Sequence, residues 1–159
     1  MELAPKDIDY VVLTHLHFMH AGGGTRRVRN GDTVPTFPQA RYLVQREAWE
    51  DALTPNELGK GSFRSEDYLP LEKAGQIDFL DGDYEIVPGV NIKVTGGHCR
   101  GHQVVIAEHD LAMGWIEHIG HRFSLRRSRE CCAHCRRKKE VFHLNLFLRL
   151  RCIRHVKWT

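Results

Sequence analysis

The sequence lacks the features that mark membrane-spanning and secreted proteins. It has no run of about 18 apolar residues, so it offers no candidate transmembrane helix. Residues 1–7 lack the basic start and apolar stretch of a secretory signal peptide. We therefore expect a cytoplasmic protein without a membrane partner. Its 159 residues, 42% of them hydrophobic, suffice for one soluble domain with its own core.

Positive charge and cysteine are scarce in the first two thirds of the chain and abundant after it. Residues 1–111 hold 11 Lys and Arg against 17 Asp and Glu, whereas residues 112–159 hold 12 against 3. Four of the five cysteines also fall in the second part: Cys131, Cys132, Cys135 and Cys152. This change indicates either a basic arm that binds nucleic acid or sequence foreign to the domain, such as a frame-shifted or misjoined end. We favour the second explanation.

Three histidines stand close together at the end of an apolar segment. His15, His17 and His20 follow residues 10–14, YVVLT, and precede the glycine-rich residues 21–24. A strand that ends in a glycine-rich turn can fold its side chains back around one ion, and neutral imidazole suits zinc and similar transition metals. The spacing differs from that of two helical ligands, which stand at i and i+4. The segment therefore predicts a metal site at a strand end.

Two segments carry a family resemblance. Residues 14–23, THLHFMHAGG, resemble the signature T-H-x-H-x-D-H-x-G-G of the metallo-β-lactamase superfamily, and residues 95–103, TGGHCRGHQ, are similar to that family's T-P-G-H-T-P-G-H-Q. Residues 36–45 and 86–90 also resemble the lactonase-like branch of the family. The resemblance covers roughly residues 5–115.

The resemblance implies an α+β fold, the family's αββα sandwich, and the pattern along the chain is β-rich with interspersed helices. Family members carry several strands before the first histidine motif, so we expect a truncated sandwich whose exposed strand edges favour self-association. We divide the chain into a partial metallo-β-lactamase-like domain, residues 1–116, and a basic Cys/His-rich tail, residues 117–159. Strands are expected at 9–14, 41–45, 77–80, 84–87, 90–95, 103–108 and 111–116, helices at 46–53 and 68–74, and a loop at 26–39.

By resemblance, His15, His17 and His98 would hold one zinc ion and leave its fourth position open for water. The ion lowers the pKa of that water to about 7, so zinc-bound water would attack a carbonyl carbon. The lactonase-like segments imply a small-molecule lactone or ester as substrate. Nucleic acid is not an expected partner.

The family pattern is broken at the second metal site. Met19 stands in place of the aspartate, and Gly114-Trp115 stands where a Gly-Asp pair is expected, with Glu117 out of register. His20 would be the only recognised ligand of a second ion, and one neutral imidazole does not hold a divalent metal against water. We expect one zinc ion and a second site that is weak or empty. Catalysis should be weak or absent, because the second ion of a two-metal site stabilises charge on the reacting oxygens.

The sequence alone supports three interpretations of what the protein does. The first interpretation is an impaired metal-dependent hydrolase. A second is a non-catalytic fragment or binding protein, which Met19 and Trp115 favour. A third takes the tail as a nucleic-acid-binding arm.

Several other side chains have expected supporting roles. His102, Thr14 and Thr95 would stabilise the two histidine segments through hydrogen bonds. The large aromatic residues Tyr42, Trp49 and Tyr68 would pack in the core rather than line a substrate cleft.

Overall fold

A computed structural model describes residues 4–108, 139–142 and 146–148 of the chain. Its α-helices are α1 (Phe18–Ala21), α2 (Arg46–Leu53) and α3 (Leu69–Lys73). Its strands are β1 (Tyr10–Val12), β2 (Thr25–Arg27), β3 (Thr33–Pro35), β4 (Arg41–Gln45), β5 (Ile77–Leu80), β6 (Tyr84–Val87), β7 (Val90–Val94), β8 (Gln103–Glu108), β9 (Lys139–Phe142) and β10 (Leu146–Leu148).

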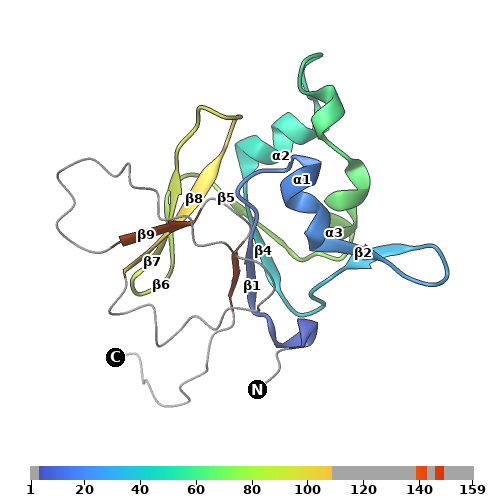
Figure 1. The fold of residues 1–159 in the computed structure, drawn as a ribbon, viewed down its shortest axis with the longest axis horizontal. Coiled ribbons are helices and arrows are strands. Elements are labelled where there is room, and N and C mark those ends of the chain that lie inside the picture. The colour runs from blue at the N-terminus through green and yellow to red at the C-terminus, as the bar shows by residue number, and fades with distance from the viewer. Residues whose placement is uncertain (1–3, 109–138, 143–145, 149–159) are drawn as a thin grey trace.

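The elements form a layer of helices, a first sheet and a second sheet (Figure 1). The first sheet has the order β10-β1-β4-β5, in which β1, β4 and β5 are parallel and β10 is antiparallel to β1. The second sheet, β6-β7-β8-β9, is antiparallel throughout. The three α-helices lie on the side of the first sheet that faces away from the second (Figure 1). The predicted α+β class and sandwich architecture are confirmed. None of the described helices is long and apolar enough to cross a membrane.

The strands at the centre of the first sheet are covered on both faces. In β1, Val11 belongs to the core beneath the helices, and its neighbour Val12 belongs to the core between the sheets. In β4, Tyr42 and Val44 face the helices while Leu43 faces the second sheet. A strand buried on both faces needs apolar side chains in succession. The unbroken apolar runs in the sequence are what this packing requires.

The predicted core aromatics are buried beneath the helices. Tyr42, Trp49 and Tyr68 are all less than a tenth exposed. The hydroxyl of Tyr42 donates to the carbonyl oxygen of Gly24 at 2.8 Å, and that of Tyr68 donates to the carbonyl oxygen of Ala52 at 3.0 Å. Each phenol therefore has a partner within the core, which removes the cost of burying its oxygen.

Most predicted elements are present, and one prediction is wrong. The strands β4, β5 and β6 and the helix α2 have the expected bounds. Residues 26–39, expected to be a loop, contain most of an antiparallel hairpin formed by β2 and β3. Gly31 adopts a left-handed φ of 92°, and the side chain of Asn30 bonds both the backbone and the carboxylate of Asp32. This turn lets two short polar segments pair. The strand expected at 111–116 lies outside the described residues.

Two strands from beyond residue 116 join the sheets. β9 pairs antiparallel with β8, and β10 pairs antiparallel with β1, so each sheet gains one edge strand. The other edges of these sheets are β5 and β6. The division at residues 116 and 117 stays a prediction, as does self-association. The cysteine cluster of the tail lies outside the part of the chain that the structure describes.

A buried glutamine joins the two sheets beside the histidine segments. The side-chain amide of Gln103, at the start of β8, donates to the carbonyl oxygens of Leu13 at 2.8 Å and Leu43 at 3.0 Å. Its backbone N–H donates to the carbonyl oxygen of Thr14 at 3.0 Å. Its Oε1 accepts a 2.8 Å hydrogen bond from Gln45. These bonds fix the start of β8 against the ends of β1 and β4.

The loop between β7 and β8 contacts α2 at a position where only glycine fits. Gly101 has a φ of 64°, and a Cβ there would lie 2.4 Å from the backbone nitrogen of Ala48. Glycine adopts this conformation readily and presents no side chain to the helix. The contact sets the distance between α2 and the loop that carries His98.

Replacing Gln103 with Leu should destabilise the sandwich, because it removes the donors that the Leu13 and Leu43 carbonyls share. We expect the free energy of unfolding in urea to fall by about 1–3 kcal/mol. The matched variant Gln39→Leu, at an exposed position, should change it by less than about 0.5 kcal/mol. Equal effects of the two substitutions would show that the hydrogen bonds of Gln103 do not stabilise the fold.

Replacing Gly101 with Ala should also destabilise the protein. The left-handed backbone alone costs about 1–2 kcal/mol for a non-glycine residue, and the contact with α2 adds to this cost. Gly61→Ala is the control, since a Cβ at Gly61 meets no atom within 4 Å. Thermal unfolding of the two variants measures the difference, and a Gly101→Ala variant as stable as Gly61→Ala would contradict the close approach.

Candidate metal centre

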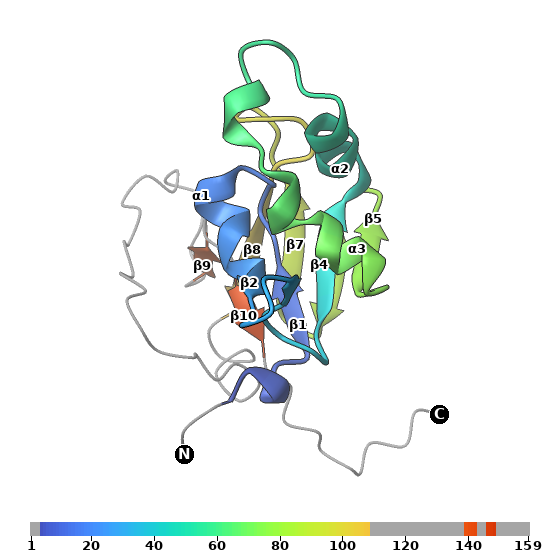
Figure 2. The same cartoon turned by 90° about the vertical axis from the view of Figure 1, so that its right-hand side faces the viewer.

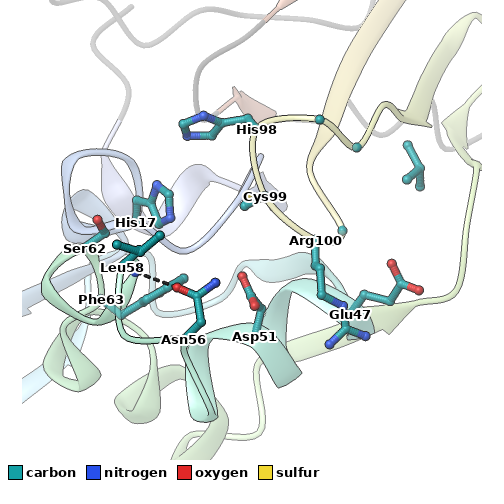
Figure 3. Close-up of a pocket in the computed structure, with 15 residues that line it drawn as sticks. His17, Glu47, Asp51, Asn56, Leu58, Ser62, Phe63, His98, Cys99 and Arg100 are labelled. Atoms are coloured by element: carbon teal, nitrogen blue, oxygen red, sulfur yellow. Dashed lines mark hydrogen bonds between the residues drawn. The ribbon is translucent and has the colours of Figure 1, made fainter.

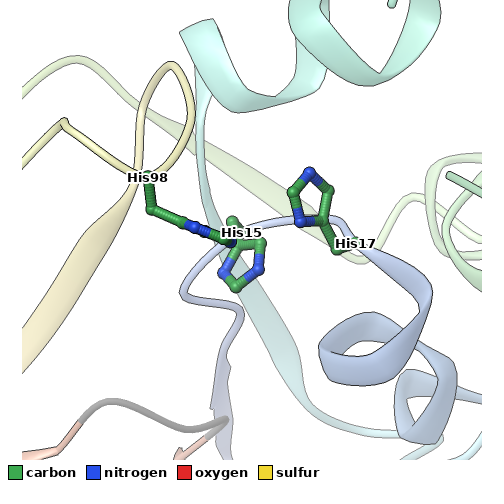
Figure 4. Close-up of side chains that lie close together, drawn as sticks. All are labelled: His15, His17 and His98. Atoms are coloured by element: carbon green, nitrogen blue, oxygen red, sulfur yellow. The ribbon is translucent and has the colours of Figure 1, made fainter. Parts of the chain in front are cut away.

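The segment that follows β1 and the loop between β7 and β8 lie at the same end of the sandwich (Figure 2). Three imidazole rings from these two segments meet there (Figure 4). His15 and His17 follow β1, and His98 lies in the loop between β7 and β8. One ring nitrogen of each lies within 4.8 Å of the corresponding nitrogens of the other two, so the group could hold a metal ion. Zinc binds imidazole nitrogen at about 2.0–2.1 Å, and small side-chain rotations would bring three such atoms to that distance.

His15 is the buried member of the group and is only 2% exposed. Its Nδ1 lies 3.1 Å from the hydroxyl of Thr14, which bears out the supporting role expected for Thr14. In the tautomer whose Nδ1 donates to Thr14, Nε2 presents its lone pair to the other histidines. That Nε2 is buried and has no hydrogen-bond partner among the described residues. Buried polar atoms normally have a bonding partner, and a bound cation would supply one for this nitrogen.

The surroundings of His15, His17 and His20 hold these side chains as neutral imidazoles. Burial, with smaller contributions from the adjacent histidines, His20 first, lowers the pKa of His15 to about 3. Burial is also the main cause of the lowered pKa of His17 and of His20, and His98 adds to it in both cases. Metal binding requires deprotonated ligands. These side chains are therefore already in the binding form at neutral pH.

The backbone at the start of α1 holds His17 in place. The carbonyl oxygen of His17 accepts hydrogen bonds from the N–H groups of His20 at 2.8 Å and Ala21 at 2.9 Å, which begin the helix. The ring of His17 packs edge-on against Phe63 with centroids 4.8 Å apart, and the backbones of the two residues form a β-bridge. The segment around Phe63 therefore fixes the direction of this imidazole.

The loop of His98 is closed by hydrogen bonds between its ends. The N–H of Thr95 donates to the carbonyl oxygen of His102 at 2.9 Å, and the Thr95 hydroxyl lies 2.6 Å from Nδ1 of His102. Thr95 thus has the supporting role that the sequence predicted. Gly96 and Gly97 both adopt left-handed φ angles, 58° and 84°, which turn the chain toward the other histidines. His98 itself is exposed on the side of the cluster that faces solvent.

The set of ligands expected for a second metal ion is only partly present among the described residues. The ring of His20 lies 4.2 Å from that of His15, but its nitrogens do not belong to the metal-binding group found among the described residues. The side chain of Met19 is 79% exposed. Trp115 and Glu117 lie outside the described residues. The structure thus brings His15, His17 and His98 together and places His20 beside them.

A pocket of about 700 Å³ opens beside His17 and His98 (Figure 3). Its walls combine apolar and charged side chains from α2, from the segment after it and from the His98 loop: Glu47, Asp51, Leu58, Phe63, Cys99 and Arg100. The pocket is open to solvent and borders two of the three histidines. Its volume is large enough for a small molecule to bind next to them.

The charges of this pocket were not anticipated from the sequence. Asp51 opposes the fall in the pKa of His17, and together with burial it raises the pKa of the Cys99 thiol to about 11. The guanidinium of Arg100 lies 3.7 Å from the carboxylate of Glu50, and both are largely exposed. The i, i+4 spacing of Glu47 and Asp51 was the available sequence signal, but nothing in it indicated that α2 borders the histidines.

Comparison with known proteins identifies the family. The family model of the metallo-β-lactamase superfamily matches residues 1–110 of this chain. An N-acyl homoserine lactonase of Bacillus thuringiensis is 38% identical over 104 residues, which cover 65% of this chain and 34% of that protein. The N-acyl homoserine lactonase AttM of Rhizobium radiobacter is 34% identical over 109 residues, covering 64% and 36%. The chain thus spans about a third of the length of the curated relatives it matches.

Solved structures agree with these relatives. A probable metal-dependent hydrolase from Staphylococcus aureus superposes with a TM-score of 0.58 at 32% identity and covers 66% of this chain and 36% of its own. An N-acyl homoserine lactone hydrolase, solved with N-hexanoyl-L-homoserine at its catalytic metal centre, superposes with a TM-score of 0.50 at 38% identity, covering 65% and 34%. The chain belongs to the metallo-β-lactamase superfamily and is a lactonase-like member of it.

Proposed function

We propose that this chain is a metal-dependent hydrolase that binds one zinc ion through His15, His17 and His98 and cleaves lactones or small esters. The observation that carries the proposal is the convergence of three imidazoles beside an open pocket. Its relatives are N-acyl homoserine lactonases, so an N-acyl homoserine lactone is the first substrate to test. The expected cytoplasmic location stays a prediction.

The donor set fits zinc. Three neutral nitrogen ligands leave one tetrahedral position open, which is the arrangement of catalytic rather than structural zinc sites. The buried Nε2 of His15, which has no hydrogen-bond partner in the part of the chain that the structure describes, supplies one ligand atom, and the less buried His17 and His98 supply the others. When bound, zinc polarises a carbonyl group and lowers the pKa of water at its open position to about 7.

The protein's own contribution is to hold the ligands and to position the substrate. Thr14 orients His15, Phe63 packs against His17, and the closed loop carries His98. Leu58 and Phe63 give one wall of the pocket an apolar surface on which an acyl chain can lie. A carbonyl group placed at the histidines would thus leave the remainder of the substrate in the pocket.

Activity should be weak because the second metal site is incomplete. Met19 supplies neither charge nor a hard oxygen donor, and its side chain is exposed. Losing one electrostatic stabiliser of developing charge costs on the order of 2.7–4 kcal/mol of barrier, a factor of roughly a hundred to a thousand in rate. We therefore propose one tightly held zinc ion per chain and slow hydrolysis.

The proposal predicts that His15→Ala removes the zinc ion. The purified full-length chain should contain about one equivalent of zinc by elemental analysis, and the variant should contain almost none. Hydrolysis of N-hexanoyl homoserine lactone should disappear both in this variant and after chelation. His155→Ala is the comparison, because it removes a histidine from the tail; zinc lost from that variant but kept by His15→Ala would contradict the proposed site.

Met19→Asp should raise the zinc content above one equivalent and speed hydrolysis, because it returns a carboxylate to the family position beside His20. The exposure of Met19 indicates that the fold will tolerate the change. Met19→Asn is the matched control, since asparagine has the shape of aspartate without its charge. Two tightly bound equivalents in the unmodified chain would contradict the incomplete second site.

A further inference from the structure

The proposed zinc site contains no charged ligand, and this leaves the charge of the ion uncompensated. Three imidazoles contribute none, and the nearest sequence position that could supply a carboxylate in this family holds Met19, which is uncharged and exposed. Divalent ions in protein sites are stabilised by nearby negative charge even where it does not coordinate them. A carboxylate elsewhere on the site's wall would meet that need.

The carboxylates that line the adjoining pocket come from α2. They belong to Glu47 and Asp51, which stand one helical turn apart on the same face. In Figure 3, Asp51 lies on the His17 side of Arg100, whereas Glu47 lies on the other side. Asp51 is therefore the one placed toward the histidines. We propose that Asp51 is an electrostatic partner of the metal site, which raises the affinity of the three histidines for a divalent cation without coordinating it.

The packing of α2 holds Asp51 in this position. Ala48, Trp49 and Ala52 on the opposite face are buried in the core. The ring of Trp49 lies edge-on to those of Tyr68 and Phe79, with centroids 5.4 Å and 5.5 Å apart. These contacts fix the rotation of the helix about its axis. Since the loop of His98 also packs against Ala48 through Gly101, the carboxylate and the loop share one rigid support.

The carboxylate of Asp51 faces the same pocket as two of the proposed ligands. Asp51, His17 and His98 all line it. The positive charge of Arg100, which also lines the pocket, is partly offset by the carboxylate of Glu50, 3.7 Å from its guanidinium. The negative charge of Asp51 therefore acts across the space that borders the histidines, where the cation would lie.

This inference rests on the proposed zinc site, and a direct binding measurement tests it. We would measure the dissociation constant of Zn²⁺ for the full chain by competition with a chromophoric chelator at low ionic strength. Asp51→Asn should weaken binding about 3- to 30-fold, the range expected for one unit charge acting through partly hydrated space. The effect should shrink at high salt, because screening reduces interactions between exposed charges.

Two further variants separate charge from structure. Asp51→Glu keeps the charge and should bind Zn²⁺ within about 3-fold of the unmodified chain. Glu72→Gln removes the same charge from an exposed position on α3, which does not line the pocket, and should leave zinc affinity nearly unchanged. Urea unfolding of each zinc-free variant checks that the fold is retained.

The outcomes are distinct. Equal zinc affinity of Asp51→Asn and the unmodified chain would overturn this inference and leave the zinc site standing. A loss that Asp51→Glu shares, that is unaffected by salt or that Glu72→Gln reproduces would also overturn it, because the effect would then be structural or general. An unmodified chain that binds no zinc would overturn the proposed function itself.

Discussion

The hydrogen bonds of Gln103 are the constraint on which the histidine cluster depends. They connect positions 90 residues apart in the chain and place the start of β8 directly against Leu13 and Thr14, the residues that precede His15. His98 reaches His15 only because the loop before β8 is anchored there. If the fold did not hold the three imidazoles together, the free energy of cation binding would have to offset the conformational entropy lost in ordering both histidine segments. Here the buried sandwich supplies that order.

The elements that the sequence predicted are those determined by local pattern. Residues 41–45 have the apolar run of a buried strand, and Ala48, Trp49 and Ala52 recur at helical spacing, so β4 and α2 were predicted at their observed bounds. The β2–β3 hairpin was missed because its strands are short and polar and two prolines suggested a loop. Its pairing depends on the turn at Gly31, which no periodicity reveals.

The residues of the candidate site also fall into those that the sequence predicted and those that it did not. His15, His17 and His98 could be predicted because metal ligands require particular residue types at particular spacing. Gln103 and Asp51 could not be assigned, since their roles depend on which elements become neighbours in space. Gly101 is similar: the sequence shows a glycine, but only the approach of Ala48 explains why a larger residue would not fit. Tertiary proximity, rather than residue type, carries this information.

The burial of His15 has a physical consequence for the cluster as a whole. Its pKa is near 6.5 in the unfolded chain and about 3 in the folded one, so between these values the unfolded chain binds more protons. Stability therefore falls as the pH drops from 6.5 toward 3, and no such loss occurs above 6.5. In that upper range the fold keeps the imidazole neutral even without a cation. Because no proton must be displaced from His15, the free energy of cation binding at neutral pH goes into coordination.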